Sequence, residues 1–208
     1  MTPRTPSRLP GELSLNRRAL DDLGFIRRTM ESAGAHTAIP GWGGVLMGAT
    51  ACAAAPFAIA AESGAAWFGV WMVAAAVGAS IGGLEMWRKA RDEGVSLVAG
   101  PGSRFAKALA PGLIAGLLLT LALRAVGPLD LLPGMWLLCY GTAVIGAGAH
   151  SICAVRSMGL AIMLVGSVAL LGTVFLRDSR LFGDLCMVAG FGVMHVVFGF
   201  RVARERRG

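Results

Sequence analysis

Six apolar stretches dominate the pattern of hydrophobic and polar positions along the chain. Each is close to the roughly 20 residues that an α-helix needs to cross the apolar core of a bilayer. Together they cover residues 43–61, 66–87, 108–126, 134–153, 157–176 and 185–200. The pattern predicts an all-α fold, a polytopic membrane bundle whose six transmembrane helices form three antiparallel hairpins.

The first 40 residues are more polar and contain one helical pattern, over residues 14–33. Leu20, Leu23 and Ile26 recur every three residues on one face, and the charged residues lie away from it. We expect residues 1–40 to form a cytoplasmic N-terminal segment with an amphipathic helix. That helix would lie on the lipid bilayer, contact a cytoplasmic or membrane protein partner, or simply flank the bundle.

Composition narrows the class of protein. The chain is 55% hydrophobic and only 15% charged, which is too apolar for a disordered chain and too poor in charge for an ordinary soluble domain. Its 30 glycines follow no G-X-Y period, which excludes collagen. The composition therefore agrees with a membrane protein.

The basic residues indicate an orientation. Of the 19 lysines and arginines, 16 lie in the N-terminal segment, in the 88–107 connection, at Arg156 or near the C-terminus. Because basic residues collect on the cytoplasmic side, we expect both termini there. The transmembrane domain then covers residues 41–202, and residues 203–208 form a basic cytoplasmic tail. The formal charge of +7 thus follows the span ends and does not indicate nucleic-acid binding.

Residue usage also suggests a cellular location. Arginine outnumbers lysine by 17 to two and accompanies abundant alanine and glycine, which hints at a GC-rich bacterial genome. We therefore expect a multi-pass protein of the bacterial inner (plasma) membrane.

Three titratable residues inside the apolar runs are candidates for a polar site, because burial of such groups in a membrane is costly. Each precedes an arginine by six residues, a rise of about 9 Å along a helix. The pairs are Glu85–Arg91, His150–Arg156 and His195–Arg201. If the arginines mark the cytoplasmic edge, all three titratable groups lie at one depth.

A glutamate and two histidines suit a zinc or iron ion with an open coordination position, and His36 is a possible additional ligand. The two histidines alone suit the axial positions of a b-type haem, and the three residues together suit a proton relay. The cofactor, if there is one, is left open. In the alternative interpretation, Glu85 pairs with Arg88 or Lys89 and the histidines bond to nearby carbonyls.

Other polar and aromatic residues are expected at the span ends. Arg177, Asp178, Arg180 and Asp184 are expected to form a solvated outer loop. The tryptophans 42, 67, 87 and 136 lie near predicted span ends and are expected to anchor at the membrane interface.

No zinc-hydrolase motif H-E-x-x-H occurs, and we expect the protein not to be an enzyme. The leading hypothesis is a non-catalytic membrane protein that transports or senses a small solute or ion. Its polar site would lie near the cytoplasmic side. The alternatives are a metal- or haem-binding membrane oxidoreductase or hydrolase, and a structural or assembly subunit of a membrane complex. A homo-oligomer is compatible with each of them.

Overall fold

The structure is a computed structural model that describes residues 22–26, 41–92, 94, 101–149, 153–176 and 179–205. The chain divides into two compact units, Met1–His36 and Thr37–Gly208, and each is described by itself. In the first unit, residues 22–26 are helical. The remainder of the amphipathic helix predicted for residues 14–33 lies outside the described residues.

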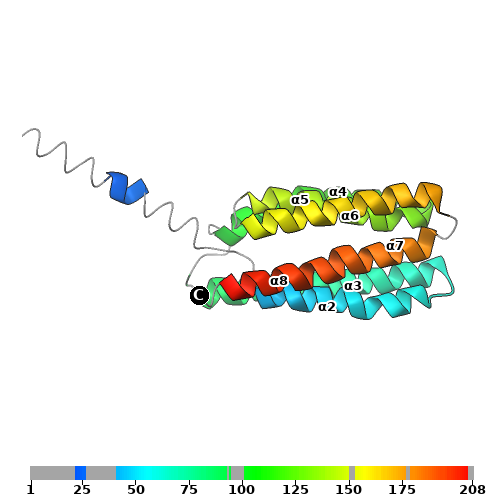
Figure 1. The fold of residues 1–208 in the computed structure, drawn as a ribbon, viewed down its shortest axis with the longest axis horizontal. Coiled ribbons are helices and arrows are strands. Elements are labelled where there is room, and N and C mark those ends of the chain that lie inside the picture. Colours follow the sequence, from blue (N-terminus) through cyan, green and yellow to red (C-terminus); the bar gives the residue numbers. More distant parts are fainter. Residues whose placement is uncertain are drawn as a thin grey trace, which may run out of the picture. The chain divides into compact units, whose positions relative to one another are not determined.

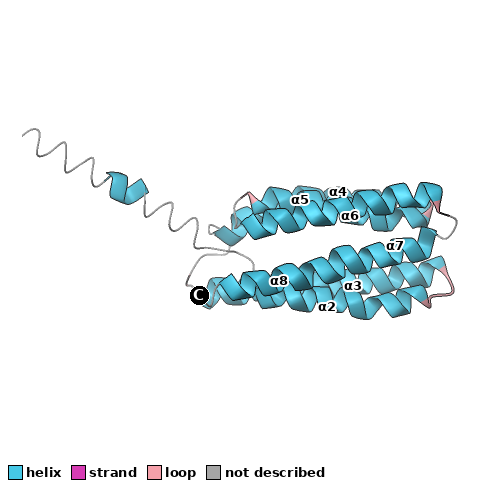
Figure 2. Ribbon diagram, viewed as in Figure 1, coloured by secondary structure: helices cyan, strands magenta, loops and turns pink. Residues whose placement is uncertain are grey.

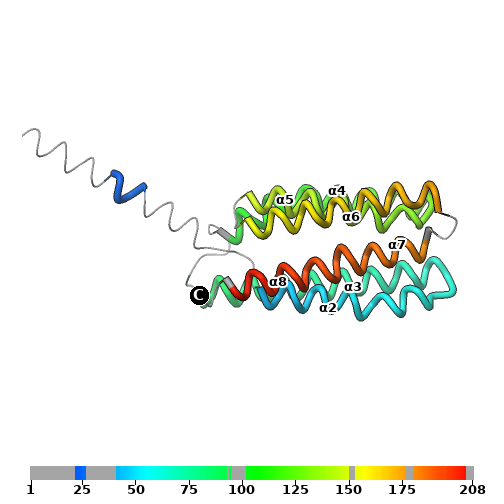
Figure 3. The backbone as a smooth tube through the Cα atoms, viewed as in Figure 1, coloured from blue at the N-terminus to red at the C-terminus, as the bar shows by residue number. Residues whose placement is uncertain are grey.

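The described part of the second unit is helical and contains no strand (Figure 2). Its helices, labelled in Figure 1, are α2 (Gly41–Ile59), α3 (Gly64–Asp92), α4 (Pro101–Val126), α5 (Leu132–Gly148), α6 (Cys153–Phe175), α7 (Ser179–Met187) and α8 (Met194–Glu205). A 3-10 turn, η1 (Leu129–Leu131), precedes α5. A π-helical turn, η2 (Val188–Val193), joins α7 to α8, so that the backbone runs through all three as one continuous rod (Figure 3).

Six of these helical stretches are long and apolar enough to cross a membrane. They are Gly41–Ile59, Gly64–Asp92, Gly102–Val126, Leu129–Gly148, Cys153–Phe175 and Arg180–Arg204. The all-helical class and the six membrane-length helices expected from the apolar runs are therefore confirmed. By length and composition, the chain is a multi-pass membrane protein.

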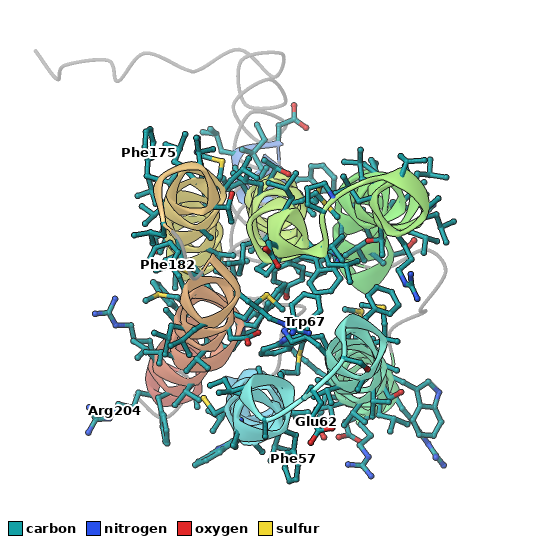
Figure 4. All side chains as sticks on the ribbon, turned by 90° about the vertical axis from the view of Figure 1, so that its right-hand side faces the viewer. Phe57, Glu62, Trp67, Phe175, Phe182 and Arg204 are labelled. Carbon is teal, nitrogen blue, oxygen red and sulfur yellow. The ribbon has the colours of Figure 1, made fainter. Side chains whose placement is uncertain are left out.

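The helices of the second unit form two layers (Figures 1 and 4). In one layer, α5 lies between α4 and α6 and packs against both. In the other layer, α2 lies between α3 and the α7–α8 rod and packs against both. The centre of the bundle lies between the two layers, and Trp67 points into it.

Glycine permits close backbone approach within each layer. In the first layer, a Cβ atom at Gly141 of α5 would lie 2.7 Å from the Met163 nitrogen of α6. In the second, a Cβ atom at Gly48 of α2 would lie 2.5 Å from the Gly192 carbonyl oxygen in η2. Only glycine allows these helix pairs to approach so closely, a mode of packing that is common between membrane helices.

The outer surface of the second unit is apolar. Leu117 on α4, Leu164 on α6 and Val73 on α3 are each about three-fifths exposed. The fully buried side chains, by contrast, include Trp67 and the charged residue Asp184. An apolar exterior around a polar and aromatic centre fits a bundle whose solvent is lipid.

Candidate functional site

A buried carboxylate lies in the centre of the bundle. Asp184, in α7, is 1% exposed. Its Oδ1 atom accepts hydrogen bonds from the indole nitrogens of Trp67, at 2.7 Å, and Trp71, at 2.9 Å. The two tryptophans are four residues apart on α3, so they lie on one helix face and their N–H groups reach the same oxygen.

The charge of Asp184 has no basic partner in direct contact. Within the described ranges, no lysine, arginine or histidine forms a salt bridge with it. The charged groups that face it at longer range are Arg180, one turn earlier, and Asp130 of η1. The Arg180 guanidinium lies over the Trp67 ring, 5.7 Å from its centroid. Both indole hydrogen bonds go to Oδ1, so Oδ2 is the carboxylate oxygen to which neither tryptophan donates.

The site extends through aromatic contacts into the other layer. Trp67 stacks on Trp136 of α5, with centroids 5.9 Å apart and planes 9° apart. The Trp136 indole donates a hydrogen bond to Thr120 Oγ1 of α4 at 2.8 Å. That hydroxyl donates in turn to the Gly116 carbonyl at 2.6 Å. A chain of contacts thus joins α7, α3, α5 and α4 around the carboxylate.

A second polar contact lies one helical turn further along α5. Tyr140 Oη and His195 Nε2 are 2.8 Å apart. His195 is 4% exposed, and its other ring nitrogen, Nδ1, is buried without a hydrogen-bond partner of good geometry. The backbone carbonyls of Gly190 and Phe191 lie near that ring. An unsatisfied polar atom in an apolar interior is costly, so Nδ1 is a position suited to a further partner.

The turn between Asp184 and His195 departs from α-helical geometry. Residues 188–193 form the π-helical turn η2, whose wider coil places one extra residue in the rod. Leu137 of α5 packs where a side chain at Gly190 would lie, and the Cys52 sulfur of α2 lies 2.5 Å from the Cβ position of Gly192. Single π-turns inside membrane-length helices are often found at functional sites.

The residues predicted from the sequence have different surroundings. Glu85 of α3 forms a salt bridge with Arg88 at 3.1 Å, and its side chain is 24% exposed. His195 is buried against Tyr140. His150 and His36 lie outside the described residues, so a shared site of Glu85, His150 and His195, with His36 added, stays a prediction. Among the residues that the structure describes, no three His, Cys, Asp or Glu side chains form a group that could hold a metal.

Two expectations from the sequence are wrong. Asp184 does not belong to a solvated loop, because the last helical rod begins at Ser179 and carries Asp184 into the interior. Trp67 is not an interfacial anchor, since it is 1% exposed and bonded to Asp184. The exposed Trp42 and Trp87 keep positions that suit anchoring. The available signals were the apolar residues on both sides of Asp184 and the four-residue spacing of Trp67 and Trp71.

Helix α3 contains one hydrolase-like motif. Residues 78–82 match the G-x-S-x-G pattern, which places a nucleophilic serine on a sharp turn between a strand and a helix. Here the motif lies within the continuous helix α3, and the exposed Ser80 hydroxyl donates to the Ala76 carbonyl at 2.8 Å. The motif therefore does not form a nucleophile elbow.

Comparison with protein-family models, with curated proteins and with solved structures finds no match to this chain. The function has to be argued from the site itself.

Proposed function

We propose that the protein is a membrane component that transports or senses a small ion or solute through the site around Asp184. The observation that carries this proposal is a carboxylate that is 1% exposed, lies in a membrane-length apolar helix and has no salt-bridge partner among the residues described. A buried ionisable group is expensive in a membrane and usually marks an ion pathway or a ligand site.

The proposed orientation places this site toward the outer side of an inner membrane. With three hairpins and both termini in the cytoplasm, the start of α7, the start of α3 and the end of α4 face outward. Asp184 is five residues from the start of α7, and Trp67 three residues from the start of α3. The site thus differs from the cytoplasmic-side site expected from the sequence. A reporter fused after Gly208 that reads as external would contradict this orientation.

The site couples its occupant to the two helix layers. A cation or proton at Oδ2 would lower the negative charge that the two indole N–H groups stabilise, and would weaken both hydrogen bonds. Because Trp67 also stacks on Trp136 of the other layer, the contact between layers would respond to occupancy. A bundle that responds in this way can carry an ion or report its presence.

We also propose binding partners for the N-terminal segment and for the outer surface of the bundle. A helix over residues 14–33 would bind the headgroups of the bilayer or a cytoplasmic or membrane protein partner. A second copy of the chain is a further partner compatible with the apolar outer surface.

The test compares two acid-to-amide variants in proteoliposomes. We expect Asp184→Asn to abolish ion flux, measured with radioactive sodium, radioactive rubidium and an internal pH dye, because it removes the site's charge. The matched control is Glu62→Gln, an exposed acid between α2 and α3, which should keep the wild-type flux. If the protein senses an ion without transporting it, the readout is the change in tryptophan fluorescence when the ion is added.

Two results would contradict the proposal. One is equal flux and equal ion-dependent fluorescence in the wild type and the correctly folded Asp184→Asn variant. The other is a wild-type protein that shows neither response. A variant that retains every response but unfolds more easily would favour the structural or assembly role instead.

A further inference from the structure

We infer that the ion handled by this protein is the proton, and that the Tyr140–His195 pair is a second proton-binding position beyond Asp184. This inference rests on the proposed function and names the ion for that same site. It is argued from the groups that surround Asp184, from His195 Nδ1, which lacks a hydrogen-bond partner, and from the π-helical turn η2 between the two residues.

The surroundings of Asp184 fit a proton better than a metal ion. A metal cation requires several oxygen, nitrogen or sulfur ligands, whereas a proton requires one oxygen. Among the residues described, Asp184 does not belong to any group of three His, Cys, Asp or Glu side chains that could hold a metal. Both nearby indoles direct N–H donors, and not their electron-rich faces, at the carboxylate. A proton on Oδ2 would leave Oδ1 as the acceptor of both indole N–H groups.

The Tyr140–His195 pair has the chemistry of a proton carrier. A tyrosine hydroxyl both donates and accepts, so it can bond to either tautomer of the imidazole. Imidazole also has two ring nitrogens, so it can accept a proton at one and release a proton from the other. Among the described side chains, Tyr140 is the titratable group that faces His195, and no charged group does so. The imidazole can therefore gain and lose charge without displacing an existing ion pair.

A proton can pass through the pair in two steps. With Nε2–H bonded to the tyrosine oxygen, Nδ1 holds a lone pair and accepts a proton, and the ring becomes an imidazolium. The proton bound at Nε2 then passes to the Tyr140 oxygen while the hydroxyl's own proton passes to a water molecule, so Tyr140 stays neutral. The ring is left neutral with its hydrogen on Nδ1, near the Gly190 and Phe191 carbonyls. A return of the tautomer resets the pair.

The Trp67–Trp136 stack would control the passage of a proton between Asp184 and His195. Asp184 and His195 are eleven residues apart on one rod, about 16 Å at an α-helical rise. The Trp67–Trp136 stack separates the Asp184 cluster from Tyr140, which follows Trp136 by one turn. Protonation of Asp184 weakens the hydrogen bond that anchors Trp67. Release of that stack admits the water that carries a proton onward to Nδ1 of His195.

Proton flux into vesicles tests the inference. The full-length protein is reconstituted with a pH-sensitive dye inside, and a potassium diffusion potential drives protons inward. We expect the wild type and the Glu62→Gln control to acidify the lumen. Asp184→Asn and His195→Gln should fall to the rate of empty vesicles. His195→Gln should nevertheless keep the pH-dependent tryptophan fluorescence, because its Asp184 cluster is intact.

The outcomes separate this inference from the proposed function. Flux of sodium or rubidium that depends on Asp184, without proton flux, overturns the proton assignment and leaves the proposed function standing. Wild-type proton flux in His195→Gln overturns the second position. A protein with no flux and no fluorescence response removes the proposed function as well.

A measurement on the unmodified protein covers the case in which the variants do not fold. Nitrogen-15 NMR of labelled histidine reports the tautomer and charge of each imidazole. We expect one buried imidazole, close in space to the single tyrosine, to change its protonation as the pH is lowered. A signal near that tyrosine that stays in one fixed tautomer throughout would overturn the role of His195.

Discussion

At the scale of single residues, the indole N–H groups decide how a carboxylate is accommodated inside the bundle. Asp184 has no basic side chain in direct contact among the described residues, and two tryptophans of α3 supply its hydrogen bonds. Hydrogen bonds to a charged group are stronger than neutral ones, but they compensate only part of the cost of burial. In the proposed function, this residual cost makes the position responsive to a proton or cation.

Removal of one indole N–H group should therefore cost stability. We expect Trp71→Phe to lower the free energy of unfolding by about 1–2 kcal/mol, because it removes one hydrogen bond to Asp184 and keeps most of the ring. Unfolding in mixed detergent and SDS measures the difference. Trp87→Phe, at an exposed position, is the control and should change little. Equal stability of the two variants would mean that the Trp71 bond contributes nothing.

Of the buried polar groups, His195 was identified from the sequence as a candidate site residue, whereas Asp184, Trp67 and Trp71 were missed. His195 was recognisable because a histidine within a long apolar run is rare and costly. Asp184 was not, since Arg177, Asp178 and Arg180 precede it and give the segment the composition of a loop. Its tryptophan partners are more than 100 positions away along the chain, and a periodic pattern cannot predict such a pairing.

At the scale of helices, glycine contacts make each layer close-packed. Gly141 faces the α6 backbone, whereas Gly146, on the same helix, has only the Ala108 carbonyl oxygen near its Cβ position, at 3.6 Å. The same substitution at the two positions should therefore have opposite consequences.

We expect Gly141→Ala to destabilise the protein by about 1–3 kcal/mol, because the new methyl group would overlap the backbone of α6. Gly146→Ala should be neutral or should stabilise by up to about 1 kcal/mol, because alanine is the better helix former. Unfolding of both variants under the same detergent conditions tests this. The account of the α5–α6 contact fails if Gly141→Ala is as stable as Gly146→Ala.

The helices themselves were largely predictable, because length and apolarity determine what can cross a bilayer. The start of the last span was not. Its polar first turn, which includes Arg180 and Asp184, resembles a loop until the partners in the interior are known. The π-turn η2 was not predicted either, since it depends on how Leu137 and Cys52 pack against its glycines.

At the scale of the whole transmembrane unit, two layers meet across an interior of aromatic and polar side chains. Trp67 and Trp136 join the layers near Asp184, and Tyr140 and His195 join them again further along. Asp184 and His195, the two buried titratable residues of the proposed pathway, lie at these contacts. A change of charge at Asp184 therefore acts at the boundary between layers and not within either close-packed layer.

The central claim is that Asp184 binds an ion or proton and that Trp67 and Trp71 report its state. The most direct measurement is the NMR spectrum of the five labelled indole N–H groups while the pH and the sodium or potassium concentration are varied. Substitution of single tryptophans assigns the signals. The account predicts that the Trp67 and Trp71 signals shift together, and that Asp184→Asn abolishes the shift. Indole signals that remain constant in every condition, or that shift equally in Asp184→Asn, would contradict it.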